Sequence, residues 1–147
     1  MAVGETTVAL VGTVTSDLAR RRVSTGDDVT SFWVVSHERR FDRDTGEWVD
    51  GRQLSVRVSC WRRLADNVQV SLGKGDPVIV TGRLYTSEFD GADGGRRTIT
   101  ELDAYAVGPN LGRCATVVQR HRRDGPPASD PGPPKATDRA APAPAAV

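Results

Sequence analysis

The stretch LSVRVSCWRRLADNVQVSLGKGDPVIVTGRLYTSEF, residues 54–89, indicates the fold more clearly than any other part of the chain. Apolar and polar side chains alternate over residues 54–60, which is the period of a half-buried strand. Leu64, Val68 and Leu72 then recur at the spacing of one helical face. Glycines and a proline in residues 73–77 end the helix, because glycine permits left-handed dihedral angles and proline cannot continue the hydrogen bonding. The period of two resumes at Val78, so the predicted order is strand, short helix, glycine turn, strand.

Further strands are predicted on both sides of this stretch. Residues 7–14, 29–37 and 96–107 alternate as strands do, and residues 16–28 are polar. Residues 41–52 are interpreted as a charged loop or the end of a hairpin, with its turn at Thr45-Gly46. The chain is therefore predicted to be all-β, with a short helix between its third and fourth strands. This arrangement favours an OB-fold, a five-stranded Greek-key barrel whose strand face and loops bind oligonucleotides.

The remainder of the 147 residues divides into two short segments. Residues 1–113 are predicted as the OB domain, and residues 114–120 form an apolar stretch that is a candidate extra strand. Residues 121–147 consist mainly of Pro, Ala, Gly, Asp and Arg. Because they have hardly any apolar side chain larger than alanine to bury, they are predicted to be a disordered tail.

Charge and composition exclude little about the partners of the chain. The formal net charge is +1, and residues 1–120 hold 16 basic and 16 acidic residues. A claim of nucleic-acid binding therefore has to rest on where the arginines lie. The chain has no long apolar run and begins without the pattern of a signal peptide, which predicts a cytoplasmic protein that does not enter a membrane.

The two cysteines are expected to be reduced thiols in that compartment. Cys60 lies on the inward face with Val56 and Val58, which predicts a small core residue. Cys114 lies where the domain ends, and we treat it as a candidate thiol for a disulfide between subunits.

On the predicted strand of residues 54–61, the face that points away from the core also carries a distinctive set of side chains. Arg57 and Trp61 share the outer face with two serines. Single-strand binding needs aromatic faces that stack on bases and cations that follow the phosphates. Trp61 is therefore a candidate base platform, with packing against the helix as the alternative. Arg57, Arg62, Arg63 and Lys74 are candidate phosphate ligands, with ordinary solvated charge as the alternative, and the run Arg20–Arg22 is interpreted as solvated.

Several segments now resemble one family. They are residues 12–17 (GTVTSD), 32–35 (FWVV), 45–48 (TGEW), 61–67 (WRRLADN), 71–75 (SLGKG), 78–84 (VIVTGRL), Glu101 and residues 108–111 (GPNL). In this order they resemble the bacterial single-stranded DNA-binding proteins over roughly residues 6–113. The resemblance implies an OB-fold, a homotetramer, no cofactor, and binding of single strands that tolerates any sequence.

The resemblance adds further candidates for contacts with DNA. Family position favours Phe89 as a second platform, and Tyr85 shares its strand face, although Tyr85 equally suits the barrel edge. Trp33 lies where the family places its binding face, with burial between sheet and subunit as the alternative. Phe41 and Trp48 flank a hairpin that in this family folds over the strand, although Trp48 also suits an anchor to the barrel. Arg97 lies beside the glycine-rich tip of residues 90–95, within reach of phosphate.

Two positions depart from the family pattern. Ser55 stands where an aromatic residue is common, and the chain ends in Ala143-Pro144-Ala145-Ala146-Val147 rather than in an acidic tip. Recruitment of other proteins through such a tip is therefore not expected. These departures predict an accessory paralogue rather than the principal replication factor.

Enzyme motifs do not occur in the chain. It has two histidines, and it lacks Cys-x-x-Cys, His-Glu-x-x-His, the phosphate-cradling Gly-x-x-x-x-Gly-Lys-Ser/Thr spacing and a Gly-x-Ser-x-Gly elbow. The sequence thus predicts a non-enzymatic protein that binds and protects single-stranded DNA in replication, recombination, repair or chromosome segregation, associated with the nucleoid. The alternative is an OB module that binds a replication or repair protein and DNA only weakly. RNA binding is a third hypothesis, because stacking does not by itself exclude RNA.

Overall fold

The computed structural model describes residues 3–121, and residues 1–2 and 122–147 lie outside the described residues. The tail predicted for residues 121–147 therefore lies almost entirely outside them. A compact unit extends to Thr116, and the few described residues beyond it form a separate unit. The compact unit holds six strands and one helix: β1 (Thr6–Val14), β2 (Ala19–Arg22), β3 (Asp28–Asp42), β4 (Glu47–Trp61), α1 (Arg62–Ser71), β5 (Pro77–Asp90) and β6 (Arg96–Pro109).

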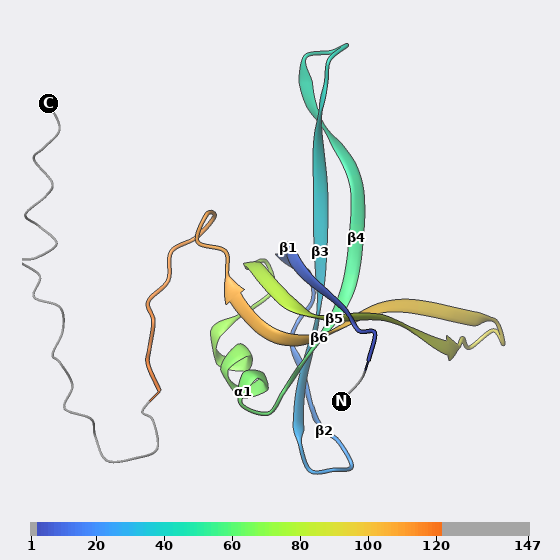
Figure 1. Ribbon diagram of the computed structural model, residues 1–147, viewed down its shortest axis with the longest axis vertical. Coiled ribbons are helices and arrows are strands. Elements are labelled where there is room, and N and C mark those ends of the chain that lie inside the picture. The colour runs from blue at the N-terminus through green and yellow to red at the C-terminus, as the bar shows by residue number, and fades with distance from the viewer. Residues whose placement is uncertain (1–2, 122–147) are drawn as a thin grey trace, which may run out of the picture. The chain divides into compact units, whose positions relative to one another are not determined.

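Five of the strands close into a barrel. The sheet order is β1-β5-β6-β4-β3-β2, and a short pairing of β1 with β3 completes the ring. The pairs are antiparallel except for β4 and β6, which run parallel. The predicted all-β OB-fold, with its helix after the third barrel strand, is confirmed. Figure 1 shows that the β3–β4 and β5–β6 hairpins extend away from the barrel in different directions.

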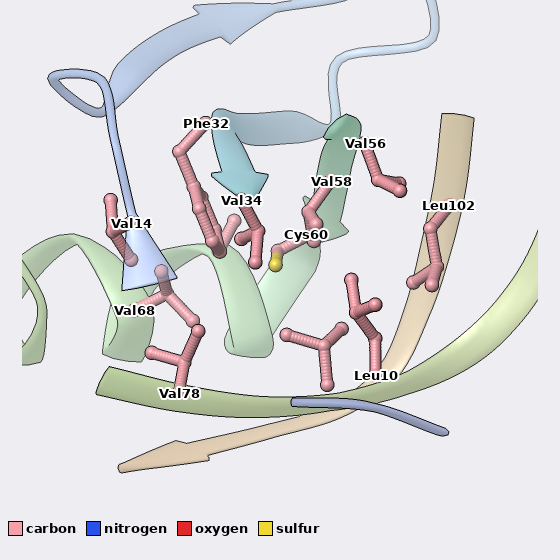
Figure 2. Close-up of a cluster of buried hydrophobic side chains, with 12 residues drawn as sticks. Leu10, Val14, Phe32, Val34, Val56, Val58, Cys60, Val68, Val78 and Leu102 are labelled. Carbon is pink, nitrogen blue, oxygen red and sulfur yellow. The ribbon is translucent and has the colours of Figure 1, made fainter. Parts of the chain in front are cut away.

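Alternation within the barrel strands builds the core. Phe32 and Leu102 are the largest fully buried side chains, and valines from β1, β3, β4 and β5 surround them (Figure 2). Because side chains of a strand point alternately to its two faces, the residues between these core positions lie on the outside of the barrel. Fully burying each such apolar side chain contributes about 1.5–3 kcal/mol to folding.

Helix α1 covers one end of the barrel core. Ala65 and Val68 are buried, and the Thr30 hydroxyl donates a hydrogen bond to the Ala65 carbonyl at 3.1 Å. The turn after the helix is fixed to the barrel, because the Gly75 amide donates to the Val14 carbonyl at 2.7 Å. Gly75 adopts a φ of +97°, which explains the glycine there.

The structure decides between the two interpretations of residues 41–52 and corrects two other expectations. Most of residues 41–52 belongs to β3 and β4, with only a short turn between them, so the segment is the end of a hairpin. Both faces of this hairpin are exposed, so it has no apolar alternation. Ala19–Arg22 forms the exposed edge strand β2, although no strand is predicted within residues 16–28. The alternation over residues 54–60 places Leu54 on the inward face with Val56 and Val58, but Leu54 is 43% exposed because it pairs with Ser36 where β3 and β4 leave the barrel.

The segment after the barrel contains no strand. Residues 114–121 have no regular secondary structure in this single chain. The extra strand predicted for residues 114–120 stays a prediction, because its pairing would involve a second copy.

Candidate nucleic-acid interface

Strand register brings four side chains into one row across the outside of the barrel. Trp33 of β3 pairs with Arg57 of β4, Arg57 pairs with Glu101 of β6, and Glu101 pairs with Tyr85 of β5. We call these four residues the central row. Three of them were predicted as site residues from strands far apart in the sequence, and the barrel places them side by side. The neighbours of Trp33 and Arg57 along β3 and β4, and Leu102 beside Glu101, point into the core.

Glu101 lies at the centre of this row and is only 6% exposed. Its Oε1 atom accepts hydrogen bonds from Arg57, one of them from Nε at 2.7 Å, and its Oε2 atom accepts one from the Ser87 hydroxyl. Burial raises the pKa of Glu101, but the hydrogen bonds from Ser87 and Arg57 outweigh burial and leave the pKa below its ordinary value. The carboxylate is therefore charged at neutral pH and holds Arg57 against the sheet.

A second arginine–carboxylate pair lies beside the central row. Arg83 Nη2 lies 2.8 Å from Asp103 Oδ2, and the Tyr85 hydroxyl donates to Asp103 Oδ1 at 3.2 Å. The Arg83 guanidinium also lies over the Tyr85 ring, 5.2 Å from its centroid. Burial, followed by the charges of Asp103 and Glu101, raises the pKa of Tyr85 to about 12. Tyr85 is thus a neutral hydrogen-bond donor at physiological pH.

A groove of about 370 Å³ opens beside Trp33. It is lined by Ser16, Asp17, Ala19, Arg21, Ser31, Phe32, Trp33 and Arg57. Its rim is fixed, because the Trp33 amide donates to the Ser16 hydroxyl at 2.8 Å. The groove combines an indole with two guanidinium groups, which are groups that can stack on a base and contact its phosphate.

Arg21 is a site residue that sequence reasoning missed. On β2 it lies on the opposite face from Arg20 and Arg22, which form ion pairs with Asp28. Arg21 lines the groove and makes no ion pair with any residue that the structure describes. The run of three arginines was interpreted as solvated charge because β2 was not predicted. Recognising a strand at residues 19–22 would have separated Arg21 from its neighbours.

The residues predicted around the helix lie away from the central row. Trp61 ends β4 and is 39% exposed, and the adjoining Arg62 contacts Asp27 at 3.5 Å. Arg63 is exposed in the first turn of α1, whereas Lys74 follows the far end of the helix. A helix of this length spans about 15 Å. Trp61 and Lys74 are therefore not one local site.

The two hairpins carry the remaining predicted residues. Phe41 and Trp48 stack edge to face at the β3–β4 hairpin, 5.6 Å between ring centroids, and are 50% and 62% exposed. Phe89 on the β5–β6 hairpin is 44% exposed and pairs with Arg97, which contacts Asp93 at 3.3 Å. The Gly95 amide and the Arg97 guanidinium hold the pKa of Asp93 below its ordinary value. Exposed aromatic rings thus occur on both hairpins.

The cationic side chains divide into paired and unpaired groups. The arginines nearest the barrel centre are held by carboxylates, whereas eight other cations form no ion pair within residues 3–121. Two of the eight, Arg113 and Arg120, follow the barrel strands, and the other six are Arg21, Arg40, Arg43, Arg52, Arg63 and Lys74. We call these six the peripheral cations. Three of them lie on the β3–β4 hairpin beside Phe41 and Trp48.

Comparison with known proteins identifies the family. The family model described as "Single-strand binding protein family" matches residues 5–109. The chain belongs to this family. A single-stranded DNA-binding protein of Paenarthrobacter aurescens is 41% identical over 121 residues, 82% of this chain and 71% of that protein. One from Mycolicibacterium smegmatis is 41% identical over 122 residues, 83% of this chain and 74% of that protein.

Solved structures of the single-strand binding protein family agree with this assignment. A small single-stranded DNA-binding protein from Streptomyces coelicolor superposes with a TM-score of 0.69 at 34% identity, covering 76% of this chain and all of that chain. The second single-stranded DNA-binding protein of Mycobacterium smegmatis gives a TM-score of 0.63 at 36% identity, with coverage of 79% and 99%. The family resemblance seen in the sequence is confirmed.

Metal ligands, helix length and the core cysteine are three further features of the described residues. Within residues 3–121, no cluster of three His, Cys, Asp or Glu side chains is placed to hold a metal ion. None of the described helices has the length and apolar character needed to cross a membrane. Burial raises the pKa of the Cys60 thiol to about 12, so this core cysteine is unreactive at neutral pH.

Proposed function

We propose that this protein binds single-stranded DNA without sequence specificity. One observation carries the proposal. Exposed aromatic rings on β3, β5 and the two hairpins occur together with arginines and a lysine on the outside of a barrel that is typical of the family. The names of the relatives, which are single-stranded DNA-binding proteins, support the ligand class. No cofactor and no catalytic step are part of this function.

In the proposed mechanism, the protein contacts single-stranded DNA in two ways, through its bases and through its phosphates. Bases stack on Trp33, Phe89 and Trp61, with Phe41 and Trp48 adding contacts along their hairpin. Each stacked base contributes about 1–3 kcal/mol and does so for any base, because every base has a π-face. Phosphates lie along the peripheral cations, with Arg57 and Arg97 as further ligands. Coating by such contacts protects transiently exposed strands from reannealing and from nucleases.

The biological setting follows from this activity. We propose an accessory copy that acts in DNA replication, recombination, repair or chromosome segregation, in the cytoplasm at the nucleoid. We further infer a homo-oligomer, with a tetramer expected from the family. Val11 of β1 and Ile79 of β5 support this assembly, because they pair across the two strands and are 52% and 39% exposed.

Tryptophan fluorescence during titration with an oligothymidine tests the proposed function. We expect strong quenching, and an affinity that falls linearly on a log–log plot against salt, because bound phosphates release counterions. Trp33→Ala and Phe89→Ala should each weaken binding by roughly tenfold or more, in line with the loss of one stacked base. Val70→Ala on the exposed side of α1 is the control and should bind as the parent does.

The outcome of that titration separates the three hypotheses. Absence of quenching at low salt contradicts the proposal and favours the OB module that binds a replication or repair protein, which capture of a partner without nucleic acid would then test. Displacement of labelled DNA by RNA of equal sequence at equal concentration would instead assign an RNA-binding protein.

We also propose Cys114 as a thiol that can join two subunits. It is partly exposed, and its Sγ atom lies 3.3 Å from the Asn110 carbonyl oxygen. Under an added disulfide oxidant, a non-reducing gel should show a dimer band that is absent in Cys114→Ser. A dimer band that persists in this variant would contradict the assignment.

A further inference from the structure

The two arginines nearest the centre of the binding face are each engaged by a carboxylate of β6. Arg57 is held by Glu101, with Nε at 2.7 Å from Oε1, and Arg83 is held by Asp103 at 2.8 Å. Both guanidinium groups remain accessible, since the Arg57 and Arg83 side chains are 40% and 37% exposed. A phosphate of a bound strand can therefore reach them, but only in competition with a carboxylate.

The competing carboxylates are fixed in place. Ser87 holds the second oxygen of Glu101, and Tyr85 holds the second oxygen of Asp103 at 3.2 Å. Neither carboxylate is free to swing away from the sheet, because Glu101 is nearly buried and Asp103 has two hydrogen-bonded partners. They remain opposite their arginines when a strand approaches.

The resulting charge at the centre of the face is not positive. Glu5 lies 4.0 Å from Arg83 Nη1, so Glu5, Glu101 and Asp103 face two arginines. Arg21 is the other cation whose charge acts on Glu101. The centre of the face thus holds as many negative groups as positive ones, and a phosphate over Arg57 or Arg83 gains less there than at the unpaired cations of the β3–β4 hairpin, which are Arg40, Arg43 and Arg52.

We propose that Glu101 and Asp103 are built-in competitors of the strand's phosphates, and that they limit both the affinity and the salt dependence of binding. This inference rests on the proposed function. An arginine whose charge is offset by a carboxylate neutralises little of a phosphate's charge, so it displaces few of the cations condensed on the DNA. Removal of the carboxylate charge turns that arginine into one more phosphate ligand.

The test is a salt titration of oligothymidine binding by Glu101→Gln. One additional phosphate contact to a single strand steepens the plot of log affinity against log salt by about 0.7. When the salt concentration is lowered tenfold, the affinity of the variant should therefore rise about fivefold more than that of the parent. Glu88→Gln is the matched control, because Glu88 also contacts an arginine, Arg96 at 3.6 Å, on the same pair of strands but on the opposite side of the hairpin. It should leave the slope unchanged.

Two further variants keep the test decisive. Asp103→Asn should steepen the slope in the same way, so the result does not depend on how well Glu101→Gln folds. Adding Arg57→Gln to Glu101→Gln should abolish the gain, because the competitor acts through that arginine. Unchanged or shallower slopes in both single variants, with the parent binding normally, would overturn the inference. Failure of the parent to bind at low salt would overturn the proposed function instead.

Discussion

At the scale of single residues, the backbone at Gly82 and at Arg62 limits which side chains these two positions tolerate. Gly82 lies in β5 at a register shift, where a Cβ atom would approach the Asp103 carbonyl oxygen to 2.1 Å and Leu102 Cδ2 to 2.8 Å. Arg62 adopts a φ of +57° immediately after Trp61, which is a left-handed conformation that disfavours residues other than glycine. The first position forbids a side chain, and the second tolerates one at a cost.

Gly82→Ala should lower the free energy of unfolding by about 3 kcal/mol, because the nearest atoms belong to the backbone of β6 and cannot move aside cheaply. Gly108→Ala is the control, since a Cβ there meets nothing within 4 Å. Urea unfolding of both variants measures the difference. Equal stability of the two would contradict the close packing at Gly82.

Arg62→Gly should raise the free energy of unfolding by roughly 0.5–1 kcal/mol, because glycine removes the steric cost of the left-handed conformation. The neighbouring Arg63→Gly should instead lower it by about 1 kcal/mol, since glycine is a poor helix former. Thermal unfolding without DNA compares the pair. A loss of stability in both variants would show that Arg62 carries no strain.

At the scale of elements, the short strand β2 pairs with β3 over all four of its residues and makes ion pairs in addition. All four of its residues are exposed, and Arg20 bridges Asp28 of β3 to Asp66 of α1. This bridge fixes β2 so that Arg21 faces the groove. The hydrogen bonds to Arg20 and Arg22 hold the pKa of Asp28 below its ordinary value.

Arg20→Gln should destabilise the protein by less than about 1 kcal/mol, which is the usual contribution of exposed ion pairs. The difference in stability between Arg20→Gln and the parent should be smaller in 1 M salt, because salt screens the parent's ion pairs and leaves less for the substitution to remove. Arg22→Gln, which removes one pair at 3.3 Å, is the comparison and should cost less. Urea unfolding at two salt concentrations checks this, and a loss that is independent of salt would contradict a bridge of charges.

At the scale of the whole molecule, stability depends on pH through carboxylates that the fold holds charged. The folded-state pKa values of Asp28, Asp93 and Glu101 lie below their ordinary values. A lowered pKa contributes stability that is present above the unfolded pKa and is lost as pH falls through the folded pKa.

The free energy of unfolding should therefore be nearly constant at neutral pH and should decline as pH falls below about 4.5. Urea midpoints between pH 7 and pH 3 measure this decline. Glu101→Gln should show a shallower acid decline than the parent, because it no longer loses that carboxylate's contribution. An identical decline in the two proteins would exclude Glu101 as a contributor.

Assembly is the other property of the whole molecule. Val11→Glu should lower the mass of the assembly in light scattering, because it places a charge in the exposed Val11–Ile79 pair proposed to be covered by another copy. Val70→Glu on α1, where the parent side chain is 84% exposed, is the control and should leave the mass unchanged. An unchanged mass in Val11→Glu would place the subunit contact elsewhere.

The barrel strands, the helix between the third and fourth of them, the core valines and the family are all predictable from the sequence. Period-two alternation reports directly which side chains face a core, and helical spacing ends visibly at glycine and proline. The sequence also predicted Trp33, Arg57 and Tyr85 as separate candidates for the binding face. It missed β2 and left residues 41–52 open between a loop and the end of a hairpin, because strands exposed on both faces carry no apolar alternation.

Which charges oppose one another is a property of the folded barrel. Arg57 and Glu101 lie 44 residues apart, and Arg83 and Asp103 lie 20 apart, so no local pattern reveals that each arginine has a carboxylate opposite it. The parallel pairing of β4 with β6 brings Glu101 beside Arg57, and the β2–β3 pairing turns Arg21 towards the groove. Charge on a strand can be counted from the sequence, but its neutralisation depends on the register of the neighbouring strand, which only the closed barrel fixes.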